Sequence, residues 1–139
     1  MRYPTPEEIL SAPVEFRSGA IVTVSEWKRK HFDHQWKNFS NEIKFHWIKL
    51  LLEELSVTYQ DRVKAPNIQA SNRSEYDNTT HTIGIVLDKP SIISALHEFA
   101  HHLYGSSEFK ACRWSVWLFK SCFPQESLKL KFKGHLLVK

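Results

Sequence analysis

The stretch from Ser91 to Pro124 constrains the fold more than any other part of this chain, and it reads SIISALHEFAHHLYGSSEFKACRWSVWLFKSCFP. Asp88, Pro90 and Ser91 form a helix-start signal ahead of it, and Gly105 is a helix-stop signal after one helix length of sequence. Between these signals, apolar residues recur with the period of a helix and predict a core-facing stripe made of Ile92, Leu96, Phe99 and Leu103. We therefore expect a core helix that ends at Gly105.

The centre of this predicted helix is an H-E-x-x-H motif formed by His97, Glu98 and His101. Residues four apart lie on the same face of a helix, so His97 and His101 could direct two imidazole nitrogens at one tetrahedral zinc ion. Glu98 would flank the metal, where its carboxylate could take a proton from a zinc-activated water molecule. The motif predicts a zinc-dependent hydrolase, in the first instance a peptidase. Two surface or core-edge histidines on an ordinary helix are the competing interpretation.

A catalytic zinc needs a third protein ligand, and Glu108 is the nearest candidate in the sequence. After Gly105, Ser106 or Ser107 could cap a second helix that runs to about Ser121. Glu108 would lie in its first turn, where its carboxylate could swing back over the cleft. The alternative role for Glu108 is a favourable interaction with the helix dipole.

Three other residues are candidate third ligands: His81, His102 and Cys112. His102 fits poorly because it is directed about 100° away from His101 around the helix. Ala111 and Ser115 share the face of Glu108 in the second helix, and their small side chains would let the two helices approach closely. Four residues are candidates to stabilise a developing oxyanion, without a motif behind any of them: Tyr76, His81, Tyr104 and Arg113.

This part of the chain resembles the minigluzincin-like metallopeptidases, including the ImmA/IrrE type. The resemblance rests on the segment HEFAHH, the turn that follows it, the E-x-x-A motif from Glu108 to Ala111, and the ending L-F-x-x-C-F-P. The resemblance covers about residues 56–124. It implies a small zincin-like α+β domain that binds Zn²⁺ through His97, His101 and Glu108, with Glu98 as general base. The chain departs from the family in having Phe99, Ala100 and a second histidine where Gly or another small residue is common. It also has Cys112 where Asn is frequent.

The whole chain, 1–139, is expected to form a single domain with a core from about 25 to 124 and a basic C-terminal tail at 125–139. Residues 2–24 predict an irregular lead-in, with a short helix that starts at Thr5 and ends near Pro13. Ser25 is expected to cap a long helical stretch that reaches Leu55, with a break at residues 40–42.

Beyond this region the period changes, and short strands are expected at residues 57–60, 67–70 and, most clearly, 81–87. Residues 71–80 predict a polar turn region. The last strand would border the cleft, where an exposed edge could hold an extended peptide by strand addition. The alternating tail, residues 127–139, predicts a strand that either completes the sheet or lies along the cleft strand and blocks it.

The composition is that of a folded chain, with 42% hydrophobic and 13% aromatic residues. No apolar run approaches the roughly 20 residues of a membrane span, and the polar N-terminus is unlike a signal peptide. Cys112 and Cys122 would lie about 15 Å apart along one helix, too far for a disulfide. These features predict a cytoplasmic protein with reduced thiols and no membrane partner.

The net charge of +4 and the pI near 9.1 are mildly basic, and no helix-turn-helix, zinc-finger or aromatic strand motif accompanies them. We therefore expect a peptide or protein substrate as the partner, in preference to nucleic acid. Two alternatives stay open. One is a non-catalytic, metal-containing regulatory or interaction protein of a mobile element, which the resemblance permits because some relatives act in gene regulation. The other is a basic nucleic-acid-binding domain with an accidental H-E-x-x-H.

Overall fold

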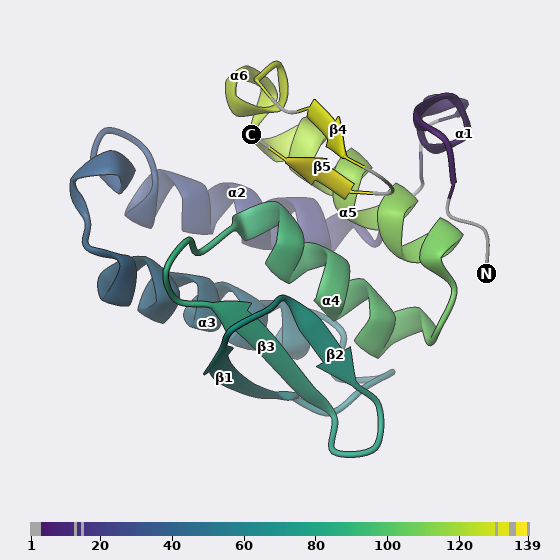
Figure 1. The fold of residues 1–139 in the computed structure, drawn as a ribbon, viewed down its shortest axis with the longest axis horizontal. Coiled ribbons are helices and arrows are strands. Elements are labelled where there is room, and N and C mark those ends of the chain that lie inside the picture. Colours follow the sequence, from purple (N-terminus) through teal and green to yellow (C-terminus); the bar gives the residue numbers. More distant parts are fainter. Residues whose placement is uncertain (1–3, 13, 15, 130, 134–135, 139) are drawn as a thin grey trace.

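The chain folds into an α+β structure in which helices pack around a small mixed sheet (Figure 1). A computed structural model describes residues 4–12, 14, 16–129, 131–133 and 136–138, the last two ranges as backbone only. Its elements in chain order are α1 (Pro6–Leu10), α2 (Ser18–His31), the 3₁₀ turn η1 (Trp36–Asn38), α3 (Asn41–Thr58), β1 (Asn67–Ser71), β2 (Glu75–Asp77), β3 (Thr82–Val86), α4 (Ile92–Tyr104), α5 (Glu108–Cys122), α6 (Pro124–Ser127), β4 (Lys131–Lys133) and β5 (Leu136–Val138).

The N-terminal region is more ordered than the sequence predicted. The short helix α1 is confirmed, and Thr5 and Glu8 form a reciprocal capping box at its start. The expectation that Ser25 caps the next helix is wrong, because α2 already begins at Ser18 and contains Ser25. The residue before α2, Arg17, makes no side-chain cap but pairs with Asp61 and lies 4.5 Å from the ring centroid of Tyr59. The start of α2 therefore coincides with contacts to residues distant in the sequence, and no local sequence pattern predicts these contacts.

Helix α3 begins where the predicted break falls, with the Ser40 side chain accepting a hydrogen bond from the backbone N–H of Ile43. The strand predicted at residues 57–60 is wrong, because α3 continues through Thr58. The β-branched residues there favour a strand only weakly. Burial of Tyr59 against the rings of Phe99 and Trp114, at centroid distances of 6.3 Å, outweighs that preference.

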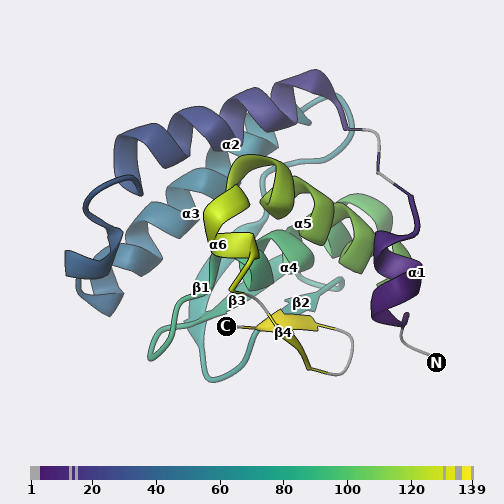
Figure 2. The ribbon, with the colours of Figure 1, turned by 90° about the horizontal axis from the view of Figure 1, so that it is seen from above.

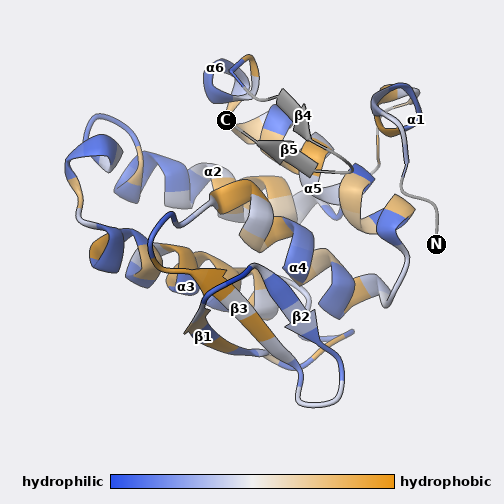
Figure 3. Cartoon of the chain, viewed as in Figure 1, coloured by the Kyte–Doolittle hydropathy of each residue, from blue (hydrophilic) through white to orange (hydrophobic). Residues whose placement is uncertain are grey.

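The three-stranded sheet has the order β1-β3-β2, with β3 parallel to β1 and antiparallel to β2. The strand predicted most clearly, β3, is therefore the central strand. The expectation that it borders the cleft is wrong. The edge strand on the cleft side is β2, which lies inside the segment predicted as a polar turn. Its residues are hydrophilic (Figure 3), so hydropathy gives no strand signal for it.

Gly84, in the middle of β3, permits the chain after β1 to fold back closely over the sheet. A Cβ atom at this position would lie 2.9 Å from Cβ of Ser71 and 3.3 Å from the carbonyl oxygen of Arg73. The second contact is with backbone and cannot relax by a rotamer change. A larger residue would therefore displace the segment that leads into β2.

The main core lies between α4 and the surrounding helices. In Figure 2, α2 lies at the top of the view and the β4–β5 hairpin at the bottom, with α4 and α5 between them. The fully buried side chains at its centre include Trp27, Leu51, Leu52, Leu96, Phe99 and Leu118. Ile9, Ala20 and Val24 are fully buried as well, so residues before 25 also contribute to the core.

The C-terminal tail forms a separate hairpin. Among the described residues β4 and β5 pair antiparallel with each other and not with the three-stranded sheet. The prediction of a tail strand is thus confirmed, and the prediction that it completes the sheet is wrong. In Figure 1, α4 lies between this hairpin and β2. Within the described part of the chain, no helix is both long and apolar enough to cross a membrane.

Candidate metal centre

Helix α4 holds the H-E-x-x-H motif in its second half. The Ser91 side chain caps the helix by accepting a hydrogen bond from the N–H of Ser94, and Gly105 ends it with φ of 82°, as predicted. The imidazole of His97 is buried, and the side chain of His101 is only 11% exposed. The two rings are 4.9 Å apart at a 78° angle. Spacing on one helix therefore brings both imidazoles together at one place.

Helix α5 supplies the third group. Ser107 caps it by accepting a hydrogen bond from the N–H of Lys110, which places Glu108 at its first position. Ala111 and Ser115 are buried, and α5 packs against α4. The Glu108 carboxylate consequently reaches both imidazoles, with Oε1 2.9 Å from Nε2 of His101 and Oε2 3.2 Å from Nε2 of His97.

These separations are close to those in the ligand set of a tetrahedral metal. Two ligand atoms that each lie about 2.0–2.1 Å from a tetrahedral zinc are about 3.4 Å apart. The observed 2.9 and 3.2 Å, one to each carboxylate oxygen, are slightly shorter and are the lengths of N–H···O hydrogen bonds, in which a proton takes the place of the metal. His97, His101 and Glu108 therefore offer ligand atoms of the right chemical type that converge on one place.

The orientation of His101 is fixed from outside the centre. Its Nδ1 lies 2.7 Å from the carbonyl oxygen of Gly105, and a carbonyl only accepts hydrogen bonds. Nδ1 therefore carries a proton, and Nε2, which faces Glu108, is the nitrogen through which His101 could bind a metal. Such a second hydrogen bond is typical of metal-binding histidines.

His97 has its second nitrogen next to a cysteine. Sγ of Cys112 lies 3.9 Å from Nδ1 of His97, on the side of the ring opposite to the nitrogen that faces Glu108. One ligand atom each of His97, Glu108 and Cys112 lie within 4.8 Å of one another, so the three residues form a second potential ligand group. Cys112 thus stays a candidate ligand, as expected from the sequence, beside the pair formed by His97 and His101. Burial, followed by the nearby Glu108 and Glu98 carboxylates, raises the pKa of its thiol to about 12.

Glu98 completes the other group of potential ligands. One of its carboxylate oxygens and one nitrogen each of His97 and His101 lie within 4.8 Å of one another. Ser74, just before β2, donates a hydrogen bond to Oε2 of Glu98 at 3.2 Å. Burial raises the pKa of Glu98 to about 7, against the opposing effects of His101 and the Ser74 hydrogen bond. A carboxyl group that titrates near neutrality beside a metal centre can both accept and return a proton.

His102 and His81 belong to a different hydrogen-bond network. The Tyr76 hydroxyl lies 2.8 Å from Nδ1 of His102 and 3.0 Å from Nδ1 of His81, and Nε2 of His102 lies 2.6 Å from the carbonyl oxygen of Lys64. That carbonyl accepts the proton of Nε2 of His102, and the Tyr76 hydroxyl is within hydrogen-bond distance of Nδ1 of both histidines. The network ties β2 to α4, and neither histidine joins the metal centre.

The four candidates for oxyanion stabilisation are not assembled at the centre. Arg113 donates to the carbonyl oxygens of Ile9 and Ala12, which fixes α1 to α5. Tyr104 lies under the guanidinium of Arg62, at 4.8 Å from ring centroid to Cζ. Tyr76 does border the cleft, but its hydroxyl is engaged with the His102 and His81 rings.

An open cleft of about 480 Å³ lies over the metal centre. One wall is the edge strand β2 with the residues around it, and the other is the C-terminal half of α4 with the turn into α5. Ser74, Glu75 and Asn78 border it without having been predicted from the sequence. They lie in a polar segment in which the spacing of residues does not match any known site motif. The pairing of β2 with β3 brings them to the cleft.

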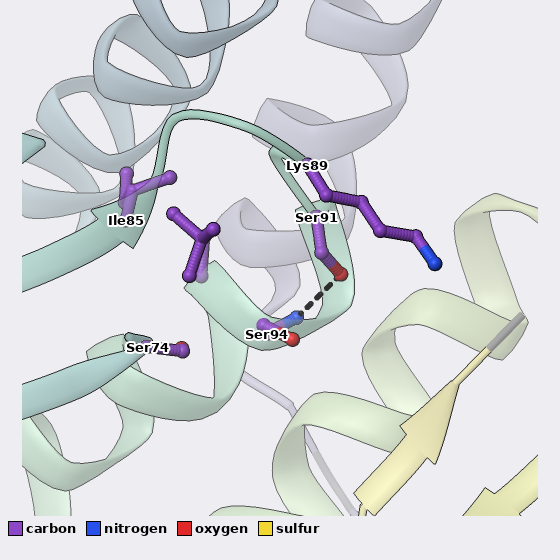
Figure 4. Close-up of a pocket in the computed structure, with 7 residues that line it drawn as sticks. Ser74, Ile85, Lys89, Ser91 and Ser94 are labelled. Atoms are coloured by element: carbon purple, nitrogen blue, oxygen red, sulfur yellow. Dashed lines mark hydrogen bonds between the residues drawn. The ribbon is translucent and has the colours of Figure 1, made fainter. Parts of the chain in front are cut away.

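Behind Ser74 is a smaller cavity of about 40 Å³, between the end of β3 and the first turns of α4 (Figure 4). Ser74, Ser91 and Ser94 line it together with Lys89 and with the apolar residues Ile85, Val86 and Ala95.

Comparisons with protein-family models, with curated proteins and with solved structures find no match for this chain. The function is therefore inferred from the metal centre and the cleft above it.

Proposed function

We propose that this protein is a zinc-dependent peptidase of the small zincin-like type. One observation carries the proposal: the Glu108 carboxylate meets Nε2 of both His97 and His101, with the Glu98 carboxylate beside them. Three protein ligands with an adjacent acidic residue are the arrangement of catalytic zinc sites, which keep one position open. The orientation of the His101 ring, held by Gly105, supports the same assignment.

In the proposed mechanism His97, His101 and Glu108 hold the metal. Zinc, when bound, supplies Lewis acidity that polarises a carbonyl group and makes a water molecule acidic near neutral pH. Glu98 accepts a proton from the attacking water through its carboxylate and delivers it to the leaving amine. The Ser74 hydrogen bond holds that carboxylate in place.

The edge strand β2 is the proposed substrate-binding element. It pairs with β3 along one edge only, and residues of the strand border the cleft. An exposed strand edge can hold an extended peptide by main-chain hydrogen bonds. A peptide bound along β2 would pass directly over Glu98.

The first test is elemental analysis of protein purified without added metal, with about one zinc per chain expected. The variant Glu98→Gln should then keep zinc and lose cleavage of a peptide library, since the amide cannot accept the proton. Protein that takes up no zinc even when zinc is offered would overturn the metal centre. Full cleavage by Glu98→Gln would overturn the peptidase mechanism while leaving the metal centre intact.

A further inference from the structure

A second cavity, of about 470 Å³, lies at the N-terminal end of α4. Its walls come from the segment around η1, the turn between β3 and α4, the first turn of α4, and α5. It shares no lining residue with the cleft over the metal centre. Its volume falls in the range of about 300–1,000 Å³ that small-molecule sites occupy.

The inner surface of this cavity is apolar and aromatic. Trp36, Ile93 and Phe119 line it and are themselves largely buried. The ring of Phe32 lies 5.4 Å from that of Trp36 at an angle of 32°, so the two form a continuous aromatic wall. A flat ring or an aliphatic chain would be removed from water in this space.

The rim of the cavity is positively charged. Lys37, Lys44 and Lys89 line it, and they come from three different segments of the chain. Among the described residues none of the three has an ion-pair partner, although Lys44 Nζ lies 5.8 Å from the centroid of the Trp36 ring. The acidic residues nearest in sequence do not line the cavity: Asp33, Glu42 and Asp88. In Figure 4 the Lys89 side chain extends from the turn away from Ser74 and Ser94.

Three lysines that line one cavity concentrate positive charge there, and an anion bound between them would reduce their mutual repulsion. The N-terminus of the 13-residue helix α4 adds the positive end of its dipole at the same place. The Ser91 hydroxyl accepts the Ser94 N–H, which leaves its own proton available to an incoming acceptor.

From the apolar wall and the cationic rim together, we propose that this cavity binds a small amphipathic anion, with a ring or chain against Trp36 and a carboxylate, sulfonate or phosphate head between the lysines. The two parts are complementary. An apolar ligand would leave the three lysines without an anionic partner, and an inorganic anion would leave the aromatic wall exposed to water. The site is independent of the proposed peptidase centre.

The test uses the full chain and two fluorescent probes with the same rings. One is 8-anilinonaphthalene-1-sulfonate, and the other is N-phenyl-1-naphthylamine, which lacks the sulfonate. The sulfonate probe should bind at one site per chain and more tightly than the neutral probe. The variant with Lys37→Gln, Lys44→Gln and Lys89→Gln should bind the sulfonate probe at least about tenfold more weakly, with unchanged affinity for the neutral probe.

A matched variant removes three exposed lysines that do not line the cavity, by Lys30→Gln, Lys64→Gln and Lys129→Gln. It has the same net charge as the first variant and should bind the sulfonate probe as the natural chain does. An equal loss of affinity in both variants would show a general charge effect and overturn the proposal. Equal affinities of the two probes, or no saturable binding of the sulfonate probe, would overturn it too.

Competition then identifies the body of the ligand. Displacement of the sulfonate probe by decanoate indicates an aliphatic chain, and displacement by 2-naphthoate indicates an aromatic ring. Either result supports the proposal. Displacement by inorganic phosphate at the same concentration would contradict it, because the apolar wall would then contribute nothing.

Discussion

The Ser74 hydroxyl donates a hydrogen bond to the Glu98 carboxylate across 3.2 Å, although the two residues are 24 positions apart in the chain. This bond connects the segment leading into the edge strand β2 with α4, the helix that carries two of the proposed metal ligands. The residue proposed to transfer the proton is thereby held by the wall proposed to bind the substrate. In the proposed mechanism, the Ser74–Glu98 hydrogen bond therefore links the position of the bound peptide to the position of the carboxylate that transfers the proton.

Replacing Ser74 by Ala should therefore slow peptide cleavage without releasing zinc. A hydrogen bond to a charged group is worth about 1.5–3 kcal/mol, so kcat/KM should fall about tenfold or more. Because the Ser74 bond lowers the pKa of Glu98, its loss should also move the acidic limb of the pH profile to higher pH. The check is kcat/KM against pH for both proteins at equal zinc content, and an unchanged profile would contradict the role of Ser74.

The stability of the metal-free protein should depend on the ionisation of Glu98. The folded pKa of about 7 lies above the ordinary value of 4.5, so the folded state binds the proton more tightly than the unfolded state. Stability is therefore highest below pH 4.5, falls as pH rises toward 7, and stays lower above it. Glu98→Gln removes this cost and should raise the free energy of unfolding by about 2–3 kcal/mol at pH 8, with little effect at pH 4.5.

Urea unfolding in the presence of a chelator measures this difference. Comparing the two proteins at each pH isolates the contribution of Glu98 together with the groups that interact with it, His101 among them. A constant difference between them from pH 4.5 to 8 would contradict the raised pKa of Glu98.

The adjacent histidines of α4 should respond differently to substitution. His101→Ala removes a proposed ligand and should lower zinc affinity by two or more orders of magnitude, since two ligands cannot form the site. His102→Ala instead breaks the bonds to Tyr76 and Lys64, so it should keep one zinc per chain and lose roughly 1–3 kcal/mol of stability. Isothermal titration with zinc and thermal unfolding separate the two effects, and equal zinc loss in both variants would argue against the ligand assignment.

Gly105 should be sensitive to substitution for a backbone reason alone. Its φ of 82° and ψ of −149° lie in a region that residues with a side chain rarely adopt, although a Cβ there meets no atom within 4 Å. Gly105→Ala should cost about 1–3 kcal/mol of stability and weaken zinc binding, because the Gly105 carbonyl orients His101. Ser106→Ala at the next, exposed position is the control and should change neither quantity. Unaltered stability of Gly105→Ala would contradict the observed backbone conformation.

The thiol of Cys112 should be unreactive in the folded protein. It is buried, and its pKa of about 12 means that the thiolate fraction at pH 8 is about a thousandfold below that of an ordinary cysteine. In the variant Cys122→Ala, which leaves Cys112 as the sole cysteine, a disulfide reagent should react slowly until denaturant is added. Rapid reaction in the native state would show that the α4–α5 contact opens readily.

Local sequence signals were sufficient to predict the two helices of the metal centre. Ser91 and Ser107 cap α4 and α5, and Gly105 separates them, as expected. Such caps depend on hydrogen bonds between residues three positions apart, so they can be read directly from the chain. The convergence of His97 and His101 follows from the same short-range geometry.

The sequence by itself thus determined which residues could bind a metal, because helix period, caps and small residues at the helix contact all act over a few positions. Only the tertiary structure decided what surrounds them. The β2 edge strand, the Ser74 bond to Glu98 and the Tyr76 bridge to His102 join segments far apart in sequence, and α2 begins where Arg17 meets Asp61. These contacts become favourable only once burial has brought distant segments together, so no local pattern encodes them.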